Sequence, residues 1–523
     1  MSKIGKYIIE NLTSGMYSDS KIVYREYIQN AADQIDVAKA QNMFPGEDLF
    51  VDISINGAMR AITIKDNATG IPADLVKKKL GDIADSDKEL GIDKGFRGIG
   101  RLGGLAYCDT LRFTSSAKGE PNKTIMTWDA KRLMALIQDK NEKDSAEALL
   151  SQVIDYETVA EHPDEHYFIV ELIGIRKENH ELLDVAAIRN YVSWNTPVPY
   201  ASKFLYRSEI YAFIDKNNLS KNEYKIYVND EEVFKNYGTY LYENSTGVPK
   251  KYDEIYGIET KIFYNSKGEM LAWMWYGISR FEKAIPASSN EMRGLRLRQS
   301  NIQLDDGQIL SKFFKESRGN SYFVGEIHAV HIDLVPNARR DYFNENSTRN
   351  ELEAQLQEYF STMHRVYHGA NDAKSAYRKE ITYRQKEAEY QKKKITGFVD
   401  DKEREKIERD LDAKRIESEK AQRTLVNLRS KTTSGEPLSR VIQKIEDTYQ
   451  PAIDAIEPPK LTQAAKSKTP PTPTKPSYVT QGLSRLDKKQ QKLVSRIYGI
   501  INDVLPENLS QELIKKIQDE LSK

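Results

Sequence analysis

Three short motifs in the first 105 residues constrain this chain most. The segment "VYREYIQNAADQ" (23–34) places Glu26, Asn30 and Asp33 at helical spacing, so that they share one face of a predicted helix. The segment "ITIKDNATGIP" (62–72) ends an apolar strand at Asp66 and turns at Gly70. The segment "GFRGIGRLGGL" (95–105) is rich in glycine. Their order and close spacing raise the question of whether they form one site.

Each motif alone also has an ordinary structural explanation. A glutamate and an asparagine one helical turn apart are common on solvated surfaces. An aspartate between a strand and a turn is commonly a turn former. A glycine-rich loop alone is weak evidence for phosphate binding. Only the combination of the three points to a site.

The combination has one economical chemical interpretation, an ATP site. Asn30 can offer its side-chain oxygen to Mg²⁺ held on a triphosphate, and Glu26 can polarise a water for attack on the γ-phosphate. Asp66 is an acceptor suited to the exocyclic amine of adenine, and the small residues Ala68 and Gly70 let the base approach the backbone. The glycine-rich segment offers successive N–H groups to the phosphates.

The order Glu-x-x-x-Asn, Asp-x-x-x-Gly and Gly-x-x-Gly-x-Gly resembles the GHKL, or Bergerat-fold, ATPases, which include gyrase, the ninety-kilodalton heat-shock chaperones, histidine kinases and MutL. In addition, "MYSDSKIVYREYIQNAADQ" (16–34) is similar to the first helix of the heat-shock chaperones. The resemblance implies that Glu26 is the general base, that Asn30 is the Mg²⁺ ligand and that Asp66 reads adenine. The further nucleotide-binding residues that it implies are Asp33, Ala68, Gly70, Gly95, Arg97, Gly98, Ile99 and Gly100.

Two positions depart from the pattern of the family. Ala68 stands where the family usually has glycine, which is a small change. The threonine that family members place on a late strand is not evident in "EHYFIVELIGI" (165–175). His166 is the nearest equivalent, and the threonine's role is not assigned to it.

A second stretch of resemblance lies further along the chain. The segments "GLRLRQSNIQLDD" (294–306) and "IDLVPNARRDYF" (332–343) are similar to the transducer domain of the heat-shock chaperones and MutL, in which a basic loop residue reaches the γ-phosphate. Arg340 occupies the corresponding place, as a clamp on charge developing in the transition state, with Arg339 as the neighbouring candidate. The alternative is that Arg340 pairs with Asp341 or caps a helix.

We therefore expect an α+β chain that begins with a Bergerat-type sandwich of helices on a mixed sheet. Residues 1–180 form the predicted ATPase domain and residues 181–345 an α/β transducer-like domain. Residues 346–430 form a helical, coiled-coil-like arm that reverses at "TGF" (396–398). Residues 431–480 are partly helical and end in a linker rich in proline, lysine and threonine, and residues 481–523 form a small helical hairpin.

Composition limits where such a protein works. Lysine and arginine together number 78, as do aspartate and glutamate, so net charge favours neither nucleic acid nor membrane. A single cysteine, Cys108, rules out an internal disulfide framework. No apolar run approaches the roughly 18 residues that span a bilayer. These features predict a soluble, cytoplasmic protein that does not contact membranes.

Two hypotheses for the function follow. An ATPase with a transducer and a helical arm resembles the MORC-type ATPases and their prokaryotic relatives, which implies a homodimeric, ATP-gated clamp on DNA. In defence against phages or mobile elements, a nuclease or helicase is then an expected partner. The alternative is a chaperone-like ATPase that remodels a protein client. The basic stretch "YRKEITYRQKEAEYQKKK" (377–394) slightly favours nucleic acid.

Overall fold

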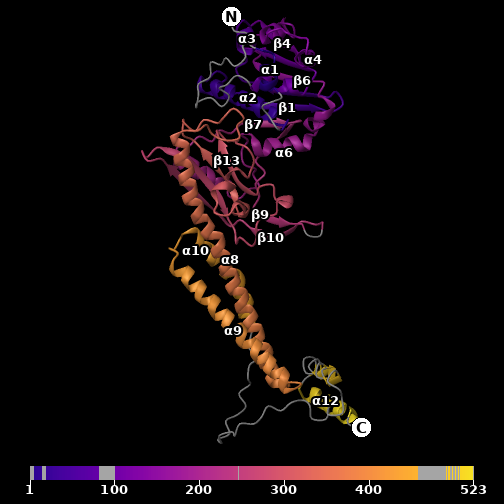
Figure 1. Cartoon of the computed structure of the whole chain (residues 1–523), viewed down its shortest axis with the longest axis vertical. Coiled ribbons are helices and arrows are strands. Elements are labelled where there is room, and N and C mark those ends of the chain that lie inside the picture. The colour runs from indigo at the N-terminus through magenta and orange to yellow at the C-terminus, as the bar shows by residue number, and fades with distance from the viewer. Residues whose placement is uncertain are drawn as a thin grey trace. The chain divides into compact units, whose positions relative to one another are not determined.

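The computed structural model describes residues 5–13, 19–81, 100–244 and 247–456, and residues 490–521 with short gaps. The chain divides into two compact units (Figure 1). The first consists of Met1–Ser279 and Lys283–His364, and the second of Arg280–Glu282 and Arg365–Lys523. The first unit contains both large β-sheets, and the second is built on helices. Among the described residues, no helix combines the length and the apolar character needed to cross a membrane.

An eight-stranded mixed sheet, in the order β5-β4-β3-β6-β2-β1-β7-β8, lies at the amino-terminal end of the first unit. Neighbouring strands are antiparallel except β1 and β7, which are parallel. Strands β7 and β8 follow the predicted domain boundary at residue 180 and extend this sheet. The strands are β1 (Phe50–Asn56), β2 (Ala61–Asp66), β3 (Thr110–Ser116), β4 (Asn122–Asp129), β5 (Ile154–Ala160), β6 (Tyr167–Ile173), β7 (Lys225–Val228) and β8 (Glu231–Glu232).

The segments "LFVDISING" (49–57) and "AMRAITIKDN" (58–67) predict a hairpin that turns around Asn56-Gly57. Strands β1 and β2 form this hairpin, with Val51 opposite Asp66. Its connection is longer than the two-residue turn expected at Asn56-Gly57, because four residues separate the strands and Arg60 adopts a left-handed conformation (φ +50°). Strand β2 also pairs with β6, which places Asp66 opposite Phe168. Asp66 therefore ends a strand inside the sheet rather than at its edge.

Helices cover one face of this sheet. Apolar residues alternate along β1 and β2, and the buried ones form a single core with the apolar residues of α2. Helix α2 contacts both strands, and it ends where Asn42 turns left-handed (φ +50°). The helical elements up to residue 195 are α1 (Tyr7–Thr13), α2 (Ile22–Ala40), α3 (Ala73–Gly81), η1 (Gly100–Ala106), α4 (Ala130–Gln138), α5 (Ala146–Ser151), η2 (Lys177–Leu183) and α6 (Val185–Asn195).

The second sheet of the first unit has five strands in the order β11-β12-β15-β13-β14, in which only β13 and β15 are parallel. Its strands are β11 (Gly257–Tyr264), β12 (Met270–Ile278), β13 (Gly294–Gln299), β14 (Ile302–Gln303) and β15 (Val324–Ala329), and β9 (Tyr240–Glu243) pairs separately with β10 (Lys250–Glu254). The helical elements of this region are α7 (Arg207–Lys216), η3 (Ala287–Ser289), η4 (Ile309–Phe313) and η5 (Ser317–Tyr322).

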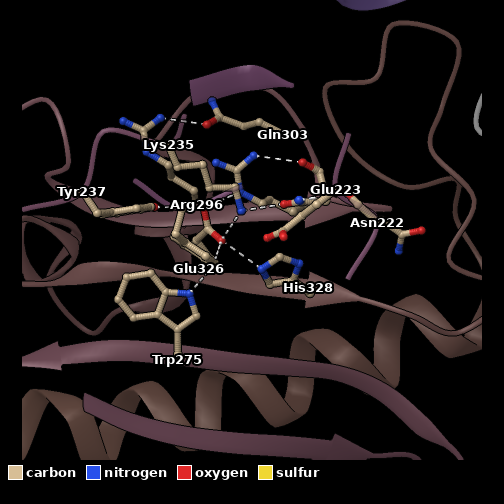
Figure 2. Close-up of polar contacts among 12 residues, drawn as sticks. Asn222, Glu223, Lys235, Tyr237, Trp275, Arg296, Gln303, Glu326 and His328 are labelled. Carbon is tan, nitrogen blue, oxygen red and sulfur yellow. Dashed lines mark hydrogen bonds and ion pairs between the residues drawn. The ribbon is translucent and has the colours of Figure 1, made fainter. Parts of the chain in front are cut away.

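A buried carboxylate, Glu326 on β15, organises the junction between the two sheets (Figure 2). Its Oε1 lies 2.6 Å from Arg298 Nε, and its Oε2 lies 2.9 Å from Lys235 Nζ. Tyr200 and Tyr237 donate hydroxyl hydrogen bonds to the same carboxylate, and His328 Nε2 lies 3.0 Å from Oε2.

The charged groups at this junction stabilise one another. Burial alone would raise the pKa of Glu326, but Arg298 and Lys235 hold it well below its usual range. Lys235 also donates to the side chain of Asn301 (2.6 Å), which in turn donates to the carbonyl of Asn222, shortly before β7. The cluster therefore fixes strands of the second sheet against the segment that enters the first.

The second unit contains the predicted helical hairpin. Helix α8 (Ser347–Thr396) ends at Gly397, which is left-handed (φ +95°), and α9 (Asp401–Ser430) starts after the capping residue Asp400. Antiparallel contacts join them, because Tyr390 bonds Glu408 and Glu380 bonds Ser418. The remaining helices of this unit are α10 (Pro437–Asp454) and α12 (Glu507–Leu521). The predicted linker at 457–477 lies outside the described residues.

Candidate functional site

Helix α2 carries the first predicted motif, and its polar face is not solvated. Glu26 and Asp33 are buried, and Asn30 is half-buried. The other side of the helix is also buried, with Ile28 and Ala32 in the core of the first unit. A surface helix would leave its polar stripe in water, whereas Glu26 and Asp33 of the first motif face the interior of the first unit.

Two arginines contact the carboxylate of Glu26. One precedes it in the same helix, and the other lies on a loop far along the chain. Arg25 Nη2 lies 3.1 Å from Oε1, and Arg340 Nε lies 3.8 Å from the same oxygen. All three side chains are buried. Because buried charges are stable only when paired, this ion pair fixes the loop that carries Arg340 beside α2.

The loop of Arg340 is held in an unusual conformation. Arg340 is left-handed (φ +56°), its N–H donates to the carbonyl of Asn337, and its own carbonyl accepts from Asp305. Such a conformation costs about 1–3 kcal/mol and persists only where surrounding contacts impose it. Asp341 accepts from the Asn337 side chain, so the alternative Arg340–Asp341 pair is not what positions Arg340. Arg339 is exposed.

The glycine-rich motif contacts the same carboxylate through Gly100. Gly95, Arg97, Gly98 and Ile99 lie outside the described residues, whereas Gly100 begins η1. A Cβ added to Gly100 would lie 2.5 Å from Oε2 of Glu26, so a side chain at this position would displace the carboxylate. The first and third motifs therefore meet at Glu26.

Tyr27, which sequence analysis did not single out, fastens η1 to α2. Its hydroxyl donates to the carbonyl of Arg101 (2.9 Å) and accepts from the N–H of Gly104 (3.1 Å). A Cβ on Gly104 would lie 2.5 Å from this hydroxyl. No residue pattern marks Tyr27, because its role depends on the packing of η1 against the helix.

The second motif buries the carboxylate of Asp66 at the end of β2. The N–H of Ala68 donates to Oδ1 of Asp66 (3.1 Å), and no described residue donates to Oδ2. Burial raises the pKa of Asp66 to about 7, against smaller opposing effects of the Ala68 hydrogen bond and of Lys65. A buried carboxylate with an oxygen open to a donor is suited to bind an N–H group of a ligand.

Gly70 and Thr69 shape the turn after Asp66. Gly70 is left-handed (φ +62°), and a Cβ there would collide with the carbonyl oxygen of Ser116, so both conformation and space require glycine. Thr69 donates to the side chain of Gln34 on α2 (2.7 Å). The turn is thus tied to the helix that carries Glu26 and Asn30.

His166 lies behind this turn. Its Nδ1 is 3.0 Å from the carbonyl oxygen of Ala68, its Nε2 is 3.0 Å from Glu47, and its ring stacks on Phe44. The imidazole is buried and contacts the second motif through the backbone. His166 therefore supports the turn through the backbone. This role differs from that of the family's threonine, whose role is not assigned to His166.

Comparison with known proteins agrees with this geometry. Residues 17–159 match the family model described as "Histidine kinase-, DNA gyrase B-, and HSP90-like ATPase". This part of the chain is a GHKL-type ATPase domain. The match includes α2, the turn after Asp66 and the glycine-rich segment, whereas Arg340 and the helical unit lie beyond it.

Curated relatives match over a part of the chain of similar length. The chain is 28% identical to the chaperone protein HtpG of Vibrio atlanticus over 141 residues, which are 24% of this chain and 22% of that protein. It is 27% identical to HtpG of Yersinia pestis over 143 residues (24% and 23%). It is 33% identical to HtpG of Alkalilimnicola ehrlichii over 93 residues (17% and 14%). The chain spans less than a quarter of the length of these relatives, so the similarity concerns only a part of each protein.

Proposed function

We propose that this protein hydrolyses ATP with Mg²⁺ at the face of α2, and that nucleotide binding gates a dimeric clamp. The observation that carries the proposal is the meeting of three distant segments at one carboxylate. Glu26 touches Arg25 in its own helix, Arg340 from the loop after β15, and Gly100 at the end of the glycine-rich motif. A site in which a base, a cation and a tight glycine turn converge suits phosphoryl transfer to water.

The residues present fit Mg²⁺ and ATP. Asp66 offers Oδ2 to an exocyclic amine, and Gly70 admits a flat base close to the backbone. Asn30 would hold Mg²⁺ through its side-chain oxygen, with Asp33 one turn further along the helix. When bound, Mg²⁺ neutralises phosphate charge and orients the γ-phosphate. Gly95, Arg97, Gly98, Ile99 and Gly100 would wrap the phosphates, as the sequence predicts.

Glu26 would act as general base on the attacking water. In this structure, its Oε1 is occupied by two arginines, so it is poorly placed to accept a proton there. A triphosphate beside α2 competes with Glu26 for Arg340, because a phosphate carries more charge than a carboxylate. Transfer of Arg340 from Glu26 to the γ-phosphate would free the base and supply the electrostatic clamp in one step.

Arg340→Gln tests this role. We expect the variant to lower the turnover number by about 10–100-fold while leaving the affinity for ATP within a few-fold, since the contact strengthens mainly in the transition state. Steady-state phosphate release and equilibrium nucleotide binding measure the two quantities separately. Arg339→Gln, an equal change at an exposed neighbour, is the matched control. Equal losses in both variants would contradict the assignment.

Two clients are compatible with an ATP-gated clamp. Nucleic acid, in a defence or DNA-remodelling role with a nuclease or helicase partner, is the candidate that the MORC-like organisation favours. A protein client is favoured by the similarity of residues 17–159 to proteins described as chaperones. The charges of the arm do not decide between them, because many basic residues of 377–394 pair with acids of the arm itself.

Client stimulation of ATP hydrolysis separates these candidates. For a nucleic-acid clamp, duplex DNA is expected to raise the ATPase rate severalfold at low salt, and the effect should fade steeply as salt increases. For a chaperone, an unfolded protein should stimulate and DNA should not. Sedimentation with a non-hydrolysable ATP analogue tests dimerisation. A chain that stays monomeric with the analogue and responds to neither client would contradict the clamp.

A further inference from the structure

A polar pocket of about 310 Å³ lies on helix α8 within the second unit, and none of its lining residues is assigned to ATP. Its lining side chains are all polar, and six of the seven come from one stripe of α8. They are Asn371, Lys374, Ser375, Arg378, Lys379 and Thr382, with Glu282 from the short segment Arg280–Glu282. Spacings of three and four residues bring such side chains to one helical face. The polar heads of these side chains give the pocket its hydrogen-bonding and charged groups.

The charges around the pocket do not balance. Glu282 is its one carboxylate, and it lies 3.0 Å from Arg378 Nη2 and 3.9 Å from Lys374 Nζ. Lys379 forms no ion pair within the described part of the chain. Three cations therefore share one anion, and one of them, Lys374, is only 2% exposed. Glu282 and the carbonyl oxygen of Phe281 already hold Lys374, and the surplus positive charge of the lining as a whole favours a further anion.

The rest of α8 shows that this surplus is local. Further along the helix, Arg384 pairs with Glu380 (2.7 Å), Lys386 pairs with Asp410 of α9 (3.3 Å), and Lys393 pairs with Glu403 (3.4 Å). The arm is thus largely self-neutralised below the pocket. Positive charge is therefore in excess at the pocket, whereas these three basic residues are neutralised by their acidic partners.

The segment Arg280–Glu282 beside the pocket has a constrained backbone. Phe281 is buried and left-handed (φ +52°), a conformation that a bulky residue adopts only under constraint. Lys374 Nζ donates to its carbonyl oxygen, and Glu282 follows directly. The conformation of this segment therefore fixes both the carboxylate and the ammonium at the base of the site.

We propose that this pocket binds a phosphate group. Arg378 offers a planar fork that matches two phosphate oxygens, and Lys374 and Lys379 add point charges. Ser375, Thr382 and Asn371 offer neutral donors to the remaining oxygens. The volume of about 310 Å³ is large enough for a phosphate or a pyrophosphate. The phosphate can come from a small free anion or from the backbone of a nucleic acid, and the two sources are separated by experiment.

The test measures binding of two probes to the full chain, with the ATP site saturated by a non-hydrolysable ATP analogue. Isothermal titration calorimetry with inorganic pyrophosphate reports on a small anion, and fluorescence anisotropy with a short DNA duplex reports on a phosphodiester. The variant R378Q/K379Q removes two exposed cations from the pocket. The control R384Q/K386Q removes the same charge from the same helix outside it.

We expect R378Q/K379Q to weaken binding of at least one probe by about tenfold or more, since hydrogen bonds to charged groups dominate such sites. The control should change it less than threefold. Arg378 also contacts Tyr449 of α10, so Lys379→Gln alone, checked by thermal unfolding, confirms that the loss is not a packing effect. Loss of pyrophosphate binding identifies a small anion, and loss of duplex binding alone identifies a nucleic acid. No binding of either probe, or equal losses in variant and control, would overturn the proposal, and neither outcome bears on the ATP site.

Discussion

Glu26→Gln is expected to lower the rate of ATP hydrolysis by about 10²–10⁴-fold, the range that general-base catalysis contributes. The amide has the shape of the carboxylate, so the contact with Gly100 is kept, but it cannot accept a proton from water. ATP affinity should stay within a few-fold, because the proposed binding contacts lie on Asn30, Asp66 and the glycine-rich segment. A rapid-quench measurement of a single turnover, together with equilibrium binding of a fluorescent ATP analogue, separates the two effects.

Asp36→Asn is the matched control for Glu26→Gln. Asp36 lies on the same helix and accepts a hydrogen bond from Tyr224, so its change to an amide is chemically equivalent but outside the proposed site. Glu26→Gln also leaves Arg25 and Arg340 without their shared anion, so thermal unfolding must show that the variant is folded. Unchanged turnover in folded Glu26→Gln would refute the assigned base.

Local patterns predicted much of the fold and part of the site geometry. The hairpin pattern around Asn56-Gly57 located β1 and β2, and the "TGF" segment correctly marked the end of α8. The burial of Asp66 at a strand end follows from its position after "ITIK". Each of these features depends on neighbours within a few residues. Sequence reasoning is strong at that range, because propensity and periodicity are local properties.

Long-range contacts could not be predicted in the same way. The addition of β7 and β8 to the first sheet depends on pairing between residues about 175 positions apart. The Glu326 cluster collects residues from 200 to 328, and no spacing marks them as partners. Resemblance to a family pointed to Arg340, but its left-handed backbone and its contact with Glu26 depend on Asn337 and Asp305. Candidate site residues could thus be proposed from the sequence, whereas the contacts that hold them in place could not be predicted.

The affinity for ATP is expected to fall as pH drops below about 7, because Asp66 then becomes protonated. Burial raises the pKa of Asp66 to about 7, and a protonated carboxyl is a poor acceptor for the amine of adenine. If only the ionised form binds, affinity falls by up to about tenfold for each pH unit below the pKa and levels off above it. Isothermal titration of ADP between pH 5.5 and 8 measures this profile.

The free energy of unfolding of the ligand-free chain is expected to fall as pH rises, whereas the affinity for nucleotide is expected to increase. Opposite trends from one carboxyl group make the prediction specific. The pKa of Asp66 is about 7 in the folded chain and about 3.9 when unfolded, so the folded state binds the extra proton between these values. Its contribution to stability is therefore complete below about pH 4 and is lost as pH rises through 7, a change on the order of 4 kcal/mol.

Asp66→Asn should bind ADP weakly and remove both trends except for the shallow titration of the phosphates. An Asp66→Asn variant that binds ADP as tightly as the natural chain would exclude Asp66 as the adenine acceptor. A wild-type profile that is flat from pH 5.5 to 8 would show that the carboxyl stays ionised in the pocket.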